Sequence, residues 1–320
     1  MNRMKNDPIL AIVVPCYNEG PVIDNTTTRL VSILNGLIEN NSISKMSFIC
    51  FVDDGSRDNT WEKIIHANKI YPNIKGIKFT KNEGHQNALL AGLLYAKKYC
   101  DCAISIDADL QQDESVIPEF INKYKNGADI VFGIRKNRST DSLIKKVTAD
   151  FFYKFMNIMN VKIIKNHADF RLLSKKAVDA LSEYNESNLF LRGIISNMGF
   201  TTDKVLFDVK KRFAGKTKYT LRKMISFAVN GITSFSIMPL RFVTIIGFIL
   251  FLFSAVMGMY ILTEAVIIQK AIPGWASTVL PIYFLGGVQL LCLGIVGEYI
   301  GKTYQEVKAR PRYIIEEKLK

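Results

Sequence analysis

Two long apolar stretches near the C-terminus constrain this chain more than any other feature of its sequence. Residues 242–268 and 279–300 are almost wholly apolar, and each exceeds the ~20 residues that a helix needs to cross a bilayer core. The linker between them, residues 269–278, carries one Lys, whereas basic residues are frequent before the first stretch and after the second. By the positive-inside rule, the sequence predicts a multi-pass protein of the cell membrane, with two spans and both termini in the cytoplasm.

The net charge of the chain limits the classes of molecule that it is expected to bind. The 320 residues include 42 Lys and Arg against 29 Asp and Glu, a formal net charge of +13. Such a chain is expected to meet polyanions. Nucleic acid would explain the charge but not the apolar stretches, so we expect no nucleic acid, and instead a lipid bilayer and phosphorylated substrates. Basic residues gather over 204–223, and residues 216–238 are predicted to form an amphipathic juxtamembrane helix on the membrane surface.

Short β-branched runs alternate with amphipathic stretches between residues 9 and 133. This alternation is typical of an α/β fold with a doubly wound, mainly parallel sheet. Strands are predicted over residues 9–14, 47–52, 74–79, 103–106 and 129–132. Helices are predicted over residues 22–38, 61–70, 88–98 and 116–124, and, less regularly, over 141–159 and 171–181.

These patterns divide the chain into four parts. We expect a cytoplasmic α/β domain, the amphipathic helix, a two-helix transmembrane hairpin and a cytoplasmic tail, over residues 1–215, 216–238, 239–302 and 303–320. In the α/β domain, ligands are expected at the carboxyl ends of the parallel strands.

Acidic residues follow the predicted strands at that edge. Asp53 follows the second strand, and the fourth is followed by Asp107, Asp109 and Gln111. Oxygen donors at this spacing suit a hard divalent cation, Mg²⁺ or Mn²⁺, which would neutralise a departing nucleoside diphosphate. The sequence has no GxGxxG after the first strand and no GxxxxGK[ST], so a dinucleotide site and a P-loop lose their main support.

Several motifs together resemble the family 2 glycosyltransferases. They are VVPCYNEG at 13–20, VDDGSRDNT at 52–60, NEGHQNALLAG at 82–92, DADLQ at 107–111, ADFRLLS at 168–174 and FLRG at 190–193. Their order, followed by RFAGKTKY at 212–219 and two apolar stretches, is similar to that of the polyprenyl-phosphate glycosyltransferases. That group includes bactoprenol glucosyltransferases and dolichol-phosphate mannose synthases. The resemblance implies a GT-A fold and a catalytic role for the α/β domain.

The resemblance also implies a set of site residues. The nucleotide sugar would be bound by Pro15, Tyr17, Glu19, Asp53, Asp107, Ala108, Asp109 and Arg135. The cation would lie on Asp107, Asp109 and Gln111, and the phosphate and acceptor on Arg171, Arg212 and Lys218. Asp169 and Asp109 would be the catalytic pair. The chain departs from its relatives at residues 215–217, which are GKT where GES is common.

Physical chemistry limits what Asp169 must do. A lipid monophosphate has a second pKa near ~6, so at neutral pH it is already largely a dianionic nucleophile. A strong general base is therefore not required, and Asp169 either orients the acceptor or accepts its residual proton. His85 is predicted to begin the helix after the third strand, with a structural or donor-loop role favoured over proton transfer.

We therefore expect an inverting transfer of one hexose, glucose or N-acetylglucosamine, from a UDP-sugar to undecaprenyl phosphate at the cytoplasmic membrane face. A flippase and a second glycosyltransferase would then use the product for cell-wall or surface glycan modification, and glycines in the second apolar stretch would allow a homo-oligomer. Two alternatives stay open. One is a processive polysaccharide synthase subunit, although its usual QxxRW motif is absent. The other is a non-catalytic membrane scaffold on a glycosyltransferase fold.

Overall fold

The computed structural model describes residues 7–136, 167–186, 189–210, 238–263 and 275–320. These residues fall into two compact units. The first contains the described residues up to 210 together with 310–320, and the second contains residues 238–263 and 275–309. The predicted helices over 141–159 and most of 216–238 lie outside the described residues.

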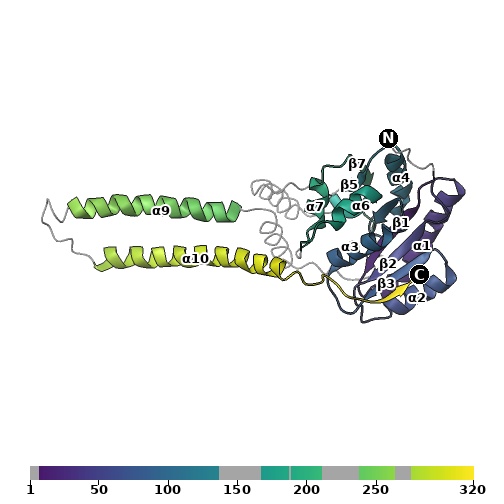
Figure 1. Ribbon diagram of the computed structural model, residues 1–320, viewed down its shortest axis with the longest axis horizontal. Coiled ribbons are helices and arrows are strands. Elements are labelled where there is room, and N and C mark those ends of the chain that lie inside the picture. The colour runs from purple at the N-terminus through teal and green to yellow at the C-terminus, as the bar shows by residue number, and fades with distance from the viewer. Residues whose placement is uncertain (1–6, 137–166, 187–188, 211–237, 264–274) are drawn as a thin grey trace. The chain divides into compact units, whose positions relative to one another are not determined.

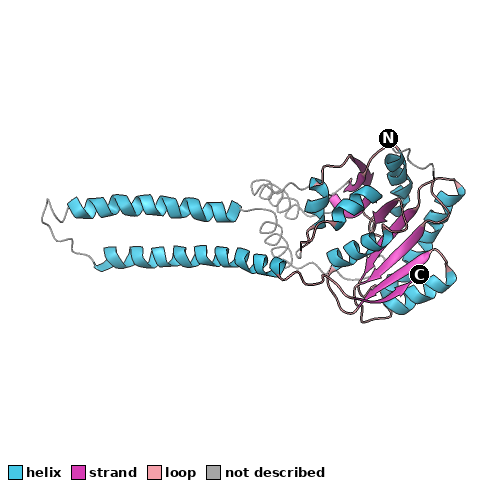
Figure 2. Ribbon diagram, in the orientation of Figure 1, coloured by secondary structure: helices cyan, strands magenta, loops and turns pink. Residues whose placement is uncertain are grey.

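The first unit is built on one eight-stranded sheet, coloured magenta in Figure 2. Its strand order is β7-β5-β6-β4-β1-β2-β3-β8. The strands are β1 Leu10–Cys16, β2 Phe48–Asp53, β3 Ile74–Phe79, β4 Cys102–Ser105, β5 Ile130–Arg135, β6 His167–Ser174, β7 Thr202–Phe207 and β8 Ile315–Leu319. The central strands β3, β2, β1 and β4 are mutually parallel, as predicted, whereas β6 runs antiparallel to β4 and β5, and β8 runs antiparallel to β3. The sheet is therefore mixed, with a parallel centre.

Helices connect the strands of the sheet. They are α1 Gly20–Glu39, α2 Thr60–Ile70, α3 His85–Ala96, α4 Ile117–Lys125, α6 Lys175–Ser182 and α7 Leu191–Asn197, with a short 3₁₀ turn η1 at Glu114–Val116. Four of these helices, α1 to α4, lie where the hydrophobic pattern predicted them, α6 overlaps the predicted range 171–181, and α7 was not predicted. One prediction is wrong: residues 171–174, expected to begin a helix, belong to β6, and the helix α6 begins at Lys175.

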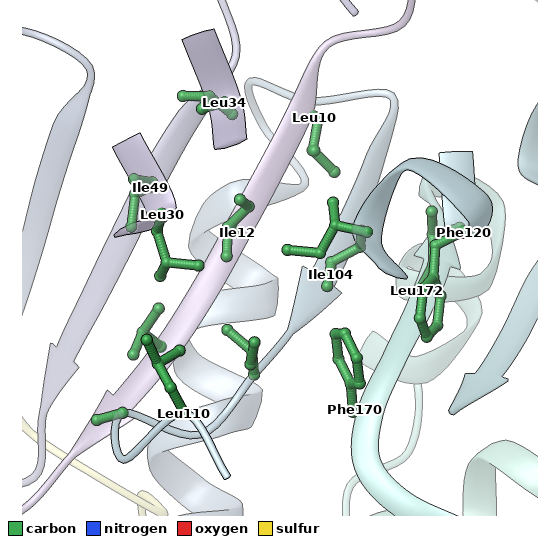
Figure 3. Packing of buried hydrophobic residues seen from close by; sticks show 14 of the residues in the cluster. Leu10, Ile12, Leu30, Leu34, Ile49, Ile104, Leu110, Phe120, Phe170 and Leu172 are labelled. Carbon is green, nitrogen blue, oxygen red and sulfur yellow. The ribbon is translucent and has the colours of Figure 1, made fainter. Parts of the chain in front are cut away.

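Both faces of the central strands are covered, so β1 and β2 are buried along their whole length. Ile12 packs in the cluster that includes Leu30 of α1 and Phe120 of α4 (Figure 3). Its neighbour Val13 points to the other face, toward α3. A Cβ on Gly92 would lie only 2.3 Å from Val13 Cγ1, so this glycine allows α3 to pack closely on the sheet.

The C-terminal residues 303–320, predicted as a cytoplasmic tail, contain the end of a helix and a strand. Helix α10 runs to Val307, and β8 then pairs with β3 at the sheet edge, where the chain ends beside it in Figure 1. Trp61 Nε1 donates a hydrogen bond of 2.9 Å to Glu317 Oε2, and the rings of Phe79 and Tyr313 stack with centroids 4.9 Å apart. The last residues of the chain are thus an integral strand of the α/β unit.

The second unit contains α9, Met238–Thr263, and α10, Trp275–Val307. Among the described residues, one stretch, Phe284–Val307, is long and apolar enough to cross a membrane, and Pro239–Leu250 is a shorter apolar helical stretch. Helices α9 and α10 overlap the two predicted spans, but among the described residues one stretch meets the requirement for a crossing, so the predicted pair of spans is not confirmed. The end of the first predicted span, residues 264–268, lies outside the described residues.

Candidate active site

The carboxyl ends of β1, β2 and β4 meet at one edge of the sheet, as the sequence predicted. Cys16 at the end of β1 is in register with Asp53 at the end of β2, and Ile106, just beyond β4, donates its N–H to Val13 of β1. The loops that follow are tied together, because Asn18 N donates to Ser56 Oγ at 2.9 Å and Arg57 N donates to Asn18 Oδ1 at 2.9 Å. This edge carries Pro15, Tyr17 and Glu19 beside the acidic residues of the other two strands.

Asp53 is a buried carboxylate with unused hydrogen-bonding capacity. It is 0% exposed, its Oδ1 accepts a bond of 3.1 Å from Ser56 N, and its Oδ2 has no partner among the described residues. Burial raises the pKa of Asp53, although the contacts with Ser56 partly offset this. A buried acceptor without a partner is costly. A donor N–H or O–H from a bound ligand would satisfy it.

Its neighbour Asp54 has a structural task. The carboxylate accepts bonds from Glu83 N at 2.7 Å, from Gly84 N at 3.0 Å and from Asn82 Nδ2 at 3.0 Å. Gly84 has φ +93°, a conformation that glycine adopts without steric cost. Asp54 thereby fixes the loop that leads into α3, whose first residue is His85, as predicted.

His85 brings two loops together. Its Nε2 lies 3.7 Å from Asp107 Oδ1, beyond β4, and 3.9 Å from Asp169 Oδ2, on β6. Asp107 and Asp169 are 62 positions apart in the sequence. The position of His85 at the start of α3 therefore places it between the two carboxylates for which the sequence predicted separate roles.

The turn after β4 is closed by a glutamine. Gln112 Nε2 donates to Asp107 Oδ2 at 2.6 Å, and Asp107 N donates to Gln112 Oε1 at 2.9 Å. Gln111, predicted as a metal ligand, donates its backbone N–H to Asp109 Oδ1 at 3.2 Å. Gln112 was not predicted as a site residue, because its burial is evident only from the fold. The assignment of the Gln111 side chain to a metal stays a prediction.

Charge crowding marks this turn as a place for a cation. Burial raises the pKa of Asp107, His85 counteracts the rise, and the carboxylates of Asp169 and Asp109 add to it. A divalent cation with oxygen ligands would relieve that repulsion, so the donor set fits Mg²⁺ or Mn²⁺. Among the described residues, no group of three or more His, Cys, Asp and Glu side chains forms a ready-made metal site. The remaining ligands would therefore come from substrate oxygens or water.

The far end of the turn is held by Lys210, which belongs to the basic stretch at residues 204–223. Lys210 N donates to the Gln111 carbonyl at 2.9 Å, and Lys210 Nζ lies 2.9 Å from Glu114 Oε2 and 2.8 Å from Asp113 Oδ1. Glu114 is buried, so it needs such a partner. Arg212 and Lys218, predicted to bind phosphate, lie outside the described residues.

Asp169 forms a buried ion triad with two arginines. Arg171 Nη2 donates to Asp169 Oδ1, while Arg192 donates to the same carboxylate through Nε, 3.2 Å from Oδ1, and through Nη2, 2.8 Å from Oδ2. Burial alone would raise the pKa of Asp169, but Arg192 and Arg171 hold it well below its usual range. Arg192 was not predicted as a site residue, although it lies in the FLRG motif at residues 190–193.

Two other predicted arginines lie in different environments. Arg171 is 0% exposed, so its position supports the Asp169 carboxylate more directly than it supports a ligand contact. Arg135 is exposed at the end of β5, where a charged ligand group can reach it.

The comparison with known proteins agrees with this arrangement. The family described as Glycosyl transferase family 2 matches residues 11–182, which span β1 to α6. The chain is a family 2 glycosyltransferase. The glycosyltransferase is 51% identical over 316 residues to the uncharacterized glycosyltransferase YkoT of Bacillus subtilis, covering 98% of this chain and 92% of that one.

Relatives with more specific names cover this glycosyltransferase almost completely. It is 40% identical over 311 residues to a prophage bactoprenol glucosyl transferase homolog of Escherichia coli, covering 96% of this chain and 98% of that one. A bactoprenol glucosyl transferase of Shigella phage SfII matches at 40% identity over 96% and 97% of the two chains. Among solved structures, the glucosyl-3-phosphoglycerate synthase of Mycobacterium tuberculosis has a TM-score of 0.44 and 14% identity, covering 71% of this chain and 78% of that one.

Proposed function

We propose that this glycosyltransferase moves one hexose, glucose or N-acetylglucosamine, from a UDP-sugar to undecaprenyl phosphate with inversion at the anomeric carbon. The observation that carries the proposal is the 40% identity to bactoprenol glucosyl transferases over 96% of the chain, from the α/β unit to the C-terminal strand. Bactoprenol, named in those relatives, is a polyprenyl lipid, so the natural acceptor is a polyprenyl phosphate.

The donor would lie along the edge formed by β1, β2 and β4. Asp53 Oδ2, buried and without a partner among the described residues, would accept a bond from the base or ribose of the nucleotide. A cation held by Asp107 and Asp109 would neutralise the UDP leaving group. Gln112 keeps the Asp107 carboxylate in a fixed orientation, and Arg135 is exposed at the end of β5, which is separated from β4 by β6. Arg212 and Lys218 are proposed to hold phosphate groups beyond this edge.

The acceptor phosphate would attack the anomeric carbon from the face of the sugar opposite the departing UDP. It needs no activation by a strong base, because it is already largely dianionic at neutral pH. The task of the protein is to hold two anionic substrates at reacting distance, which favours cationic side chains near the carboxylates.

The apolar helices fit an acceptor that resides in a bilayer. We propose a cell-membrane enzyme with two spans, both termini and the α/β unit in the cytoplasm, and an active site at the cytoplasmic face. The product, a lipid-linked sugar, would require flipping before a second glycosyltransferase consumed it.

Labelled nucleotide sugars test the proposal. Membranes that contain the protein are incubated with UDP-[¹⁴C]glucose or UDP-N-acetyl-[¹⁴C]glucosamine, undecaprenyl phosphate and Mn²⁺ or Mg²⁺. The expected result is label in the organic phase that disappears with a chelator and returns when the metal is added back. Label in a high-molecular-weight polymer would indicate a processive synthase instead. No transfer with either donor to undecaprenyl phosphate would contradict the proposal.

A further inference from the structure

We infer that Arg192 binds the acceptor phosphate, and that Asp169 is a positioning residue that holds Arg192 in place. This inference rests on the proposed function, because it assigns a residue to the acceptor in that reaction. It differs from the expectation that Asp169 itself orients the acceptor or takes its proton.

The contacts of Asp169 carry the first step. Both carboxylate oxygens already accept bonds from guanidinium groups, Oδ1 from Arg171 and from Arg192 Nε, and Oδ2 from Arg192 Nη2. A proton acceptor must offer a lone pair to the substrate at hydrogen-bonding distance. The Asp169 carboxylate is instead turned toward two permanent cations.

Differences in exposure carry the second step. The Asp169 side chain is 9% exposed and that of Arg171 is 0% exposed, whereas the Arg192 side chain is 31% exposed. Within the triad, Arg192 is the member that a ligand can reach. The bidentate contact with Asp169 fixes the plane of its guanidinium, which suits the recognition of a phosphate.

The position of Arg192 carries the third step. It is the second residue of α7, and Leu191 N donates a bond of 3.3 Å to Gln86 Oε1, so α7 is tied to the start of α3. His85, next to Gln86, lies within 3.9 Å of both Asp107 and Asp169. Arg192 therefore lies at the same edge of the sheet as the proposed donor site.

The charges of the neighbouring carboxylates explain why a cationic side chain is needed to bind the acceptor phosphate. Asp107 and Asp109 alone would repel a dianionic phosphate. Arg171, Arg192 and Asp169 together contribute one net positive charge beside them. If Asp169 were absent, Arg171 and Arg192 would repel each other, and the orientation of Arg192 would no longer be fixed.

The test uses the full-length protein in detergent with farnesyl phosphate as the acceptor. The variants are Arg192→Met, Arg192→Lys and Asp169→Asn. Lys123→Met is the matched control, because Lys123 is a similarly exposed cation in an ion pair with Asp203, outside the site. The measurements are kcat, KM for farnesyl phosphate, inhibition by UDP and Tm.

For Arg192→Met, we expect KM for farnesyl phosphate to rise by about 10-fold to 100-fold, as for loss of a charge-assisted hydrogen bond. Inhibition by UDP should stay within about 2-fold, because the donor does not depend on this contact. Arg192→Lys should fall between wild type and Arg192→Met, since Lys keeps the charge but not the fork. Lys123→Met should match wild type.

Asp169→Asn separates a positioning residue from a base. We expect its KM for farnesyl phosphate to rise as in Arg192→Met, with kcat reduced by less than about 10-fold. The fall in activity at acidic pH should be the same as in wild type, because Asp169 would not be the group that accepts a proton. A fall in kcat of about 1,000-fold at unchanged KM would make Asp169 a base and overturn the inference. Arg192→Met leaves the buried Arg171–Asp169 pair intact, so it decides the question even if Asp169→Asn does not fold.

The remaining outcomes are also decisive. An unchanged KM for farnesyl phosphate in Arg192→Met, or weaker inhibition by UDP instead, would overturn the inference while leaving the proposed function standing. If wild type transfers no sugar to any prenyl phosphate, the proposed function fails. Direct binding of farnesyl phosphate, compared with uncharged farnesol, then decides for Arg192: binding that is lost in Arg192→Met supports the inference, and binding that is unchanged overturns it.

Discussion

Gln112 and Asp107 hold each other through two hydrogen bonds, one from each partner. The amide of Gln112 donates to Asp107 Oδ2 at 2.6 Å and accepts from Asp107 N at 2.9 Å. Gln112 is 2% exposed, and its neighbour Leu110 has the uncommon φ of +46°. The conformation of the turn at residues 107–109 is thus fixed by Gln112, which lies just outside the DADLQ motif.

We predict that Gln112→Ala weakens both the fold and donor binding. The substitution removes two hydrogen bonds to the partly exposed Asp107, one of them to its charged carboxylate, which costs about 1–3 kcal/mol. Tm should fall, and KM for the nucleotide sugar should rise roughly 10-fold as Asp107 loses its orientation. Gln111→Ala should instead lower the affinity for the metal at unchanged Tm. Equal melting temperatures for Gln112→Ala and wild type would contradict the structural role of Gln112.

Asp109→Ala tests the cation site. Asp109 is half-buried in a turn, so the variant should fold and remain in the membrane. Sugar transfer should fall by at least ~100-fold, because charge developing on the leaving diphosphate would lose its stabilisation. The measurement is label transfer with and without chelator, alongside thermal melting. Full activity of wild type in chelator-treated membranes would rule out the metal assignment.

Asp53→Asn is predicted to raise the stability of the ligand-free protein and to weaken nucleotide binding. Burial raises the folded-state pKa of Asp53 above its unfolded value of ~3.9, so the folded state binds this proton more tightly. The ionised carboxylate therefore costs stability above its folded pKa, and the cost vanishes as pH falls below the unfolded pKa. The ligand-free Asp53→Asn protein should melt higher than wild type at pH 7.5, with a smaller difference at pH 4, and should bind UDP roughly 10-fold more weakly.

Asp54→Asn is the matched comparison, because Asp54 is as buried as Asp53 but both of its carboxylate oxygens accept hydrogen bonds. Its carboxylate accepts three hydrogen bonds from the loop at residues 82–84. An amide would present its own N–H to one of those donors, so Asp54→Asn should melt lower than wild type at pH 7.5. A higher melting temperature for Asp54→Asn than for Asp53→Asn would contradict the assignment of the two roles.

Removal of residues 314–320 tests the C-terminal strand. The truncation exposes the edge of β3 and removes the bond from Trp61 to Glu317. We expect Tm to fall by roughly 5 °C or more, since 1 kcal/mol shifts a domain of this size by about 2–4 °C. Faster proteolysis and aggregation through the open edge should accompany it. Glu317→Gln, which keeps an acceptor for Trp61, should stay close to wild type, and an unchanged Tm of the truncated protein would show that β8 is dispensable.

The sequence determined the elements with local signals. Strands and helices between residues 9 and 133 follow from β-branched runs, amphipathic stretches and turn residues, and the parallel order of β1, β2, β3 and β4 follows from their alternation with helices. Because parallel strands end at one edge, the shared position of Asp53 and Asp107 was also predictable.

Only the tertiary structure decided the features that depend on distant partners. Residues 167–174 form β6 because they fill the space between β4 and β5, and Arg171 can be buried in that strand because Asp169 neutralises it. No local pattern indicates that Gln112 contacts Asp107, that Arg192 contacts Asp169, or that residues 315–319 pair with β3. Hydrophobic periodicity reports which side of an element is buried, whereas pairing of charged and polar groups is fixed only when the packed chain brings them within hydrogen-bonding distance.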